Sequence, residues 1–180
     1  MTEQKQPIAI VGIGGTFPSS PELKDFWRIL ADGIYTGKEP GRDRWPLSAQ
    51  EYYDSQEGAP DKLLSTRVCT VDSIEGDFSS LAIPAEKLEG LDPLFKLTIA
   101  AGHEAFEDAQ MQDIDRARVG VNVANIVLPT DAMADMSYRI LAEKVTGFDL
   151  RAEGFPDPLN RYSAGLPAGA LAKALGLGAS

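Results

Sequence analysis

The stretch from Pro7 to Pro18, PIAIVGIGGTFP, constrains the fold of this chain more than any other part of the sequence. Apolar and mostly β-branched residues at 8–11 lead into a glycine-rich stretch at 12–15. This pattern is typical of a short buried strand that ends in a tight loop. A strand that is buried on both faces needs helices around it, so the pattern predicts the first strand of an α/β domain.

A first helix is expected after this loop. Ser20 can cap it, Pro21 suits its first turn, and Gly33 can end it in a left-handed conformation. Its large apolar side chains recur at helical spacing, which predicts that they pack inward; they are Leu23, Phe26, Trp27 and Leu30. The following residues, 34–63, are interrupted by proline and glycine and predict a long irregular segment.

The longest predicted helix runs from Asp92 to about Gln110, because Asp92 caps well and Pro93 fits the first turn. Much of its circumference is apolar or small, which predicts burial between other elements. The residues on these sides are Leu94, Leu97, Ile99, Ala101, Ala105, Phe106 and Ala109.

A second strand is predicted at 119–128 and is ended by Pro129. Thr130 or Asp131 can cap a following helix that carries Met133, Met136, Ile140 and Leu141 on one face. Two shorter elements are also expected: a strand at 68–71, and a helix at 170–175 that is closed by Gly176 and Gly178.

The single cysteine and the single histidine limit the chemistry of this chain. Cys69 lies on a β-like run and precedes no helix start that would lower the pKa of its thiol, so it is predicted to be a small apolar filler. His103 begins His-Glu-Ala-Phe-Glu, but Glu107 stands where a zinc protease needs a second histidine, so that class is excluded. His103 is interpreted as a packing or surface residue. No catalytic, cofactor-binding or metal-binding residue is therefore assigned.

The charge balance excludes some partners. Lys and Arg number 17 against 27 Asp and Glu, and the net charge is −10 with no run of basic residues. This balance repels phosphate backbones and anionic lipid, so neither nucleic acid nor a membrane is expected as a partner. The polar start at 1–6 predicts neither a signal peptide nor a membrane span, and the cytoplasm is the expected compartment.

The glycine-rich stretch at 12–15 could also belong to a dinucleotide-binding domain. That fingerprint needs Gly-x-Gly-x-x-Gly opening a helix, and here Phe17 stands at the third glycine position. Pro18 and Pro21 also intervene before the helix. The motif therefore disfavours this alternative.

Several spaced motifs in one order carry a family resemblance. They are residues 8–14, Phe17-Pro18, Phe26-Trp27, Arg44-Trp45, Asp92-Pro93, the run Glu104-Ala-Phe-Glu-Asp-Ala109 and the end from Asn160. Together they resemble the N-terminal part of the ketosynthase (β-ketoacyl synthase) domains of polyketide synthases and polyunsaturated fatty acid synthases. Leu94-Phe95-Lys96 replaces the usual Gln-Gln-Arg, which indicates a divergent member.

The resemblance implies an α/β, thiolase-like layered fold with helices packed on a mixed central sheet. It implies decarboxylative Claisen condensation of acyl and malonyl thioesters on acyl carrier proteins that bear phosphopantetheine. A homodimer and other synthase domains of the same chain are the further partners implied.

Residues 1–180 correspond by this resemblance to an N-terminal segment that stops before the expected nucleophilic cysteine and two histidines. The segment alone is therefore expected to be inactive. The alternative is a truncated, non-catalytic ketosynthase-like module with an interaction or structural role.

Overall fold

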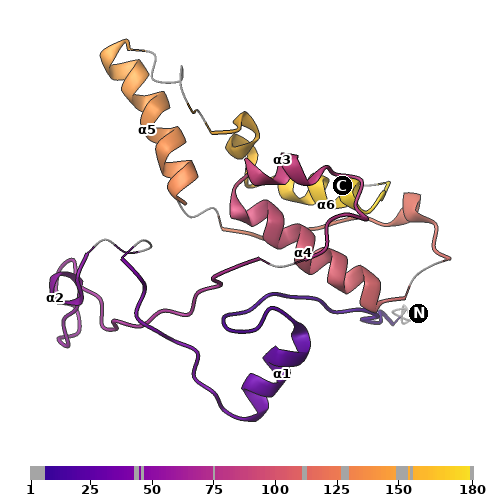
Figure 1. Cartoon of the computed structure of the whole chain (residues 1–180), viewed down its shortest axis with the longest axis horizontal. Coiled ribbons are helices and arrows are strands. Elements are labelled where there is room, and N and C mark those ends of the chain that lie inside the picture. Colours follow the sequence, from indigo (N-terminus) through magenta and orange to yellow (C-terminus); the bar gives the residue numbers. More distant parts are fainter. Residues whose placement is uncertain are drawn as a thin grey trace, which may run out of the picture. The chain divides into compact units, whose positions relative to one another are not determined.

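The computed structural model describes residues 7–42, 45, 47–74, 76–110, 113–126, 130–148, 154 and 156–178. The chain forms two compact units (Figure 1). The larger unit comprises Met1–Gly15 and Ile74–Ser180, and the smaller unit comprises Thr16–Ser73. Within the described ranges, no helix is long and apolar enough to cross a membrane.

The larger unit is built from helices. Figure 1 shows α3, α4 and α6 stacked together, while α5 runs away from them. Leu88, Ile99 and Ala174, one from each stacked helix, form its buried core. The elements are α3 (Ala85–Glu89), α4 (Pro93–Asp108), α5 (Asp131–Thr146) and α6 (Leu166–Ala174), with short 3₁₀ helices η1 (Arg116–Arg118) and η2 (Pro158–Tyr162).

Helix α4 confirms the longest helix expected from the sequence. The Asp92 carboxylate accepts a hydrogen bond from the Leu94 N–H at 2.9 Å, and Pro93 occupies the first turn. Phe95 and Ile99 are fully buried, so the helix is a central element of the unit. Its burial follows from the apolar and small residues around its circumference.

Helices α5 and α6 confirm two more predictions. The Thr130 hydroxyl accepts a hydrogen bond from the Met133 N–H at 3.3 Å and caps α5, which Gly147 ends with a φ of 76°. Helix α6 starts at Leu166, before the predicted residue 170. Gly176 follows it with a φ of 65°, the left-handed conformation that favours glycine.

The prediction of a buried first strand at 8–11 is wrong for this structure. Ile8 is 97% exposed and Ile10 is 85% exposed, and the described residues contain isolated β-bridges rather than a sheet. The described part of the second predicted strand, 119–126, is likewise not assigned as a strand. A strand is buried on both faces only when neighbouring strands and two helical layers surround it. The end of that strand at 127–129 lies outside the described residues.

The smaller unit begins with a tight turn. The N–H groups of Phe17 and Ser20 each donate to the other residue's carbonyl oxygen, at 2.9 and 3.0 Å, and Ser19 has a φ of 60°. Helix α1 (Leu23–Ala31) follows, with Glu22 rather than Ser20 at the N-cap, and Gly33 is left-handed as predicted.

The inward packing predicted for this helix is only partly correct. Phe26 stacks on Phe17 with ring centroids 3.8 Å apart, but Trp27 is 71% exposed and Leu30 is also exposed. Ile29 is the buried residue instead. The apolar periodicity therefore identified the helix but not the face that the smaller unit buries.

The rest of the smaller unit is irregular, as expected for 34–63. Helix α2 (Ala49–Tyr52) is a single turn that is stabilised by a capping box between Ser48 and Glu51. Val68, in the short strand predicted at 68–71, forms only an isolated antiparallel bridge with Lys38. Arg44 of the family motif lies outside the described residues.

Candidate functional site

The glycine-rich segment lies directly against helix α4 in the larger unit. A Cβ atom at Gly12 would lie 2.2 Å from the Ala105 carbonyl oxygen, and one at Gly14 would lie 2.4 Å from the Ala101 carbonyl oxygen. Real Cβ atoms essentially never approach closer than 3.0 Å. Neither glycine has a positive φ, so the predicted tight loop is not here but at 17–20. These glycines are required for close approach of two backbones.

Two carboxylates of α4 bind the backbone of the same segment. The Gly15 N–H donates to Glu104 Oε2 at 2.7 Å, and the Ile13 N–H donates to Asp108 Oδ2 at 2.9 Å. Glu104 and Asp108 are one helical turn apart, so they reach alternate N–H groups of the extended chain. Hydrogen bonds to ionised acceptors are stronger than neutral ones.

This contact gives a physical reason for the run from Glu104 to Ala109. Its alanines leave room for the glycines, and its acids at i and i+4 bind the N–H groups. Sequence reasoning used the run only as the mark of a buried helix and missed this binding role. The available signal was the alternation of small and acidic residues on one helical face opposite a Gly-x-Gly segment.

The same geometry disfavours a dinucleotide site. A Gly-rich phosphate loop presents free N–H groups to an anion at a helix N-terminus. Here the Ile13 and Gly15 N–H groups already bind carboxylates. A phosphate would have to displace these groups and would be repelled by them.

A shallow apolar groove of about 340 Å³ lies beside this contact. It is lined by residues 10–12 and 120–122, by Ala105 and Phe106 of α4, and by Leu171 of α6. Catalytic side chains are absent from this lining: it contains neither the cysteine nor the histidine. The groove is therefore a packing surface between two extended segments of the larger unit.

A buried polar cluster organises the N-terminal end of α4. Asn160 is completely buried; its Oδ1 accepts from the Asp92 N–H at 2.7 Å, and its Nδ2 donates to the Gly90 carbonyl at 3.1 Å. The Thr130 hydroxyl donates to the Asp92 carboxylate. The cluster joins the starts of α4 and α5 to η2, so its role is structural.

Cys69 and His103 lie in different units. Cys69 is exposed in the smaller unit, where the Thr36 hydroxyl is its hydrogen-bond donor at 3.9 Å, and this exposure contradicts its interpretation as an apolar filler. His103 is half-buried on α4, with Nε2 3.8 Å from Glu107 Oε1. No group of three or more His, Cys, Asp or Glu within the described ranges could hold a metal ion.

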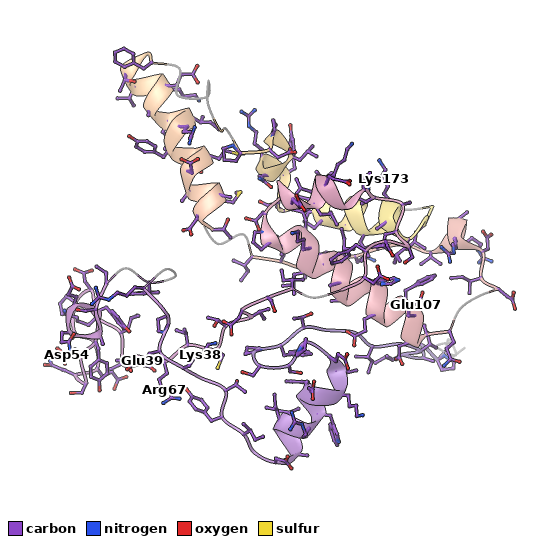
Figure 2. All side chains as sticks on the ribbon, in the orientation of Figure 1. Lys38, Glu39, Asp54, Arg67, Glu107 and Lys173 are labelled. Carbon is purple, nitrogen blue, oxygen red and sulfur yellow. The ribbon has the colours of Figure 1, made fainter. Side chains whose placement is uncertain are left out.

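The two labelled charged side chains of the larger unit, Glu107 and Lys173, do not form one site. Figure 2 shows Glu107 on α4 and Lys173 on α6 at separate places of the larger unit.

Hydrogen bonds from the Ser79 hydroxyl and N–H lower the pKa of the exposed Asp77, and the charge of His103 adds to this effect. Because its pKa is lowered, the Asp77 carboxylate is ionised at neutral pH. Its hydrogen bonds stabilise the fold at pH values above the usual carboxyl pKa, and this stabilisation is lost as the pH falls through the lowered pKa. This is the behaviour of a turn residue rather than of a general acid.

Removing the Glu104 carboxylate tests the backbone clamp. Glu104→Ala is expected to lower the free energy of unfolding by about 1.5–3 kcal/mol, because the Gly15 N–H loses an ionised acceptor. The matched control is Glu107→Ala, three residues along the same helix and exposed, for which a change of less than about 0.5 kcal/mol is expected. Urea denaturation of both variants measures the difference, and equal effects would contradict the clamp.

Comparison with known protein families assigns this chain to a family. The profile of the family described as "Beta-ketoacyl synthase, N-terminal domain" matches residues 5–179. The chain therefore belongs to the β-ketoacyl synthase family and corresponds to its N-terminal domain. The resemblance drawn from the spaced sequence motifs is confirmed.

Curated relatives include large polyketide synthases. A phenolphthiocerol/phthiocerol polyketide synthase of Mycobacterium tuberculosis is 32% identical over 128 residues, which are 67% of this chain and 7% of that protein. Polyketide synthase PksN of Bacillus subtilis is 36% identical over 109 residues, 58% of this chain and 2% of that protein. The chain thus spans a small part of the length of these relatives.

A solved structure shows the same fold. The protein described as "PfaC Keto synthase-Chain length factor" aligns with a TM-score of 0.72 and 23% identity, covering 94% of this chain and 20% of that chain. The likeness assigns the keto synthase fold, which is thiolase-like, to this chain. The expected ketosynthase fold is therefore confirmed. The expected mixed central sheet is not confirmed, because the described residues contain only isolated β-bridges.

Proposed function

We propose that this chain forms the N-terminal part of a condensing enzyme that catalyses decarboxylative Claisen condensation of acyl and malonyl thioesters. The observation that carries the proposal is the family match over residues 5–179. The packing of the glycine-rich segment on α4 supports it, because this contact brings together two of the family motifs, residues 8–14 and the run 104–109. The product belongs to polyketide or fatty acid biosynthesis in this proposal.

The catalytic nucleophile is proposed to lie outside residues 1–180. A nucleophilic cysteine needs a thiolate stabilised by a helix N-terminus or a neighbouring imidazole. Cys69 has a threonine hydroxyl as its hydrogen-bond partner and belongs to a different unit from His103. In this proposal residues 1–180 form part of the structural framework and do not include the reacting groups. No catalytic, cofactor-binding or metal-binding role is assigned to any of them.

The mixed central sheet belongs to the same proposal. Residues 10–12 and 120–122 line one apolar groove together with residues of α4 and α6, as neighbouring strands packed on one helical layer would do. In the complete domain these segments become strands, and the exposed Ile8 and Ile10 become covered. Burial of apolar surface on both faces of the sheet supplies the driving force.

The partners follow from the proposed chemistry. An acyl carrier protein presents substrates on a phosphopantetheine arm, and other synthase domains of the same polypeptide supply and process them. The complete domain is proposed to be a homodimer in the cytoplasm. The similarity of the chain to polyketide synthases supports these partners by analogy.

Acyl mapping on the native polypeptide tests the proposal. The polypeptide is purified from its source with an antibody against this chain, its intact mass is measured, and it is incubated with an acyl thioester. A mass far above 19.4 kDa and an acyl group on a cysteine outside residues 1–180 are the expected results. The Cys69→Ser variant is expected to acylate as the unchanged protein does.

Two outcomes would overturn it. Acylation of Cys69 would place the nucleophile in this chain. A native mass of 19.4 kDa without acylation would instead support the alternative, a non-catalytic ketosynthase-like module with an interaction or structural role.

A further inference from the structure

The carbonyl groups at the C-terminal end of α6 are all hydrogen-bonded. A helix leaves its last carbonyl groups without partners in the regular helical pattern, so other donors must supply them. The carbonyl oxygens of 171–174 accept backbone N–H groups at 2.8 to 3.2 Å. The carbonyl oxygen of Leu175 accepts instead from a side chain, the Nη1 of Arg116, at 2.6 Å. The last turn of α6 therefore depends on a residue that lies 59 positions earlier in the chain.

The Arg116 guanidinium is itself held by other elements of the larger unit. Its central carbon lies 5.0 Å from the ring centre of Phe106 on α4, which is a cation–π contact. Its backbone belongs to η1, where the Asp115 carboxylate accepts the Ala117 N–H at 3.1 Å. A positive charge beside the last carbonyl groups of a helix is also favoured by the helix dipole. Arg116 therefore connects the end of α6 to both α4 and η1.

The same residue directs the chain after α6. Gly176 turns the chain out of the helix with a φ of 65°. Two residues later, the Gly178 N–H donates to the Arg116 carbonyl oxygen at 2.9 Å. A Cβ atom at Gly178 would lie 2.5 Å from the Cα of Ala117, so the chain passes directly against η1. The side chain and the main chain of Arg116 together set the path of 176–178.

We propose that Arg116 is a positioning residue for the condensing reaction. The inference rests on the function proposed above, and it places the nucleophilic cysteine on the chain that continues from Gly178. A reacting group that is misplaced by about 1 Å can lower a rate on the order of 100-fold. A residue that fixes the direction of this chain therefore affects the reaction without touching the acyl group or the thiol.

Acylation rates of the native polypeptide test this role. In this step the cysteine thiolate bonds to the acyl carbon, and the sulfur of the acyl thioester leaves as a thiolate. Arg116→Ala is expected to lower the maximal acylation rate constant about 10-fold. The half-saturating concentration of acyl thioester is expected to change less than about twofold, because substrate binding is not altered. Arg116→Lys is expected to recover most of the rate, since an ammonium group also donates to a carbonyl oxygen.

Two further variants separate the contact from the charge. Arg118→Ala removes the same charge from η1 but leaves the Leu175 carbonyl bound, so it is the matched control and is expected to acylate as the unchanged protein does. Gly178→Ala pushes the chain away from Ala117 and keeps Arg116, and it is expected to slow acylation as well.

Two readouts distinguish positioning from stability. Rates are divided by the amount of cysteine that is acylated at long times, so a loss of folded protein does not lower them. Hydrogen exchange of the Leu177 and Gly178 N–H groups reports the path of the chain directly, because these groups bind the Ala172 and Arg116 carbonyl oxygens. Exchange is expected to be about 5- to 10-fold faster in Arg116→Ala and unchanged in Arg118→Ala.

The outcomes separate the role of Arg116 from the condensing function. Slower acylation in Arg116→Ala and Gly178→Ala, with recovery in Arg116→Lys and an unchanged rate in Arg118→Ala, supports the inference. An unchanged rate in Arg116→Ala with a lower free energy of unfolding overturns it and leaves the condensing function standing, because Arg116 then only stabilises α6. An equal loss in Arg118→Ala also overturns it. If the unchanged polypeptide is not acylated, the condensing function fails and the positioning role fails with it.

Discussion

Replacing Gly14 with alanine is expected to lower the free energy of unfolding by about 2–3 kcal/mol. The added Cβ would lie 2.4 Å from both the Ala101 carbonyl oxygen and the Ala105 backbone nitrogen of α4. Backbone atoms in the middle of a helix cannot move aside as a flexible side chain can. The segment at 12–15 must therefore separate from α4, and its hydrogen bonds to Glu104 and Asp108 are lost with it.

Gly120→Ala is the matched control for this change. A Cβ atom at Gly120 would meet no other atom within 4 Å, and the residue has no positive φ. Its substitution is expected to be neutral or to stabilise by up to about 1 kcal/mol. Urea denaturation measures both variants, and hydrogen exchange at Ile13 and Gly15 reports whether the segment has separated. Equal stability of the two variants would show that the segment does not pack on α4.

Replacing Asn160 with leucine is expected to cost about 2–3 kcal/mol of stability. The leucine side chain has a similar size but neither accepts from the buried Asp92 N–H nor donates to the Gly90 carbonyl. A buried donor that loses its acceptor keeps its full desolvation penalty. Because Asp92 also caps α4, the first turn of this helix is expected to loosen as well.

Asn122→Leu is the control for the loss of the amide. Asn122 is exposed, so its replacement is expected to change the free energy of unfolding by less than about 0.5 kcal/mol. Thermal and urea denaturation of the two variants give the comparison. A tolerated leucine at 160 would mean that the polar cluster does not hold the starts of α4 and α5 together.

The two contacts that these predictions test both position helix α4, and the proposed condensing function depends on that position. The glycine contact fixes the path of residues 12–15 on α4, and the polar cluster fixes the start of the same helix. Both contacts involve α4, which forms part of the groove where we propose that the sheet of the complete domain forms. A condensing enzyme needs its reacting groups held within a fraction of an ångström, so loosening this layer is expected to reduce condensation in the complete domain.

Local sequence by itself determined the helices and their ends. Asp92-Pro93 starts α4, Thr130 caps α5, and Gly33 lies after α1 in the left-handed conformation. These signals depend on groups only a few residues apart, which is why they can be read without a structure. The order of spaced motifs likewise determined the family, as the match over residues 5–179 confirms.

Tertiary structure alone decided which faces are buried and what the motifs do. Gly12 and Gly14 make a backbone contact rather than a turn because residues about 90 positions away supply α4. Trp27, Ile8 and Ile10 are exposed although their patterns predicted burial. An apolar pattern shows that a face can be buried, whereas the partner that buries it is set by contacts between residues far apart in the chain.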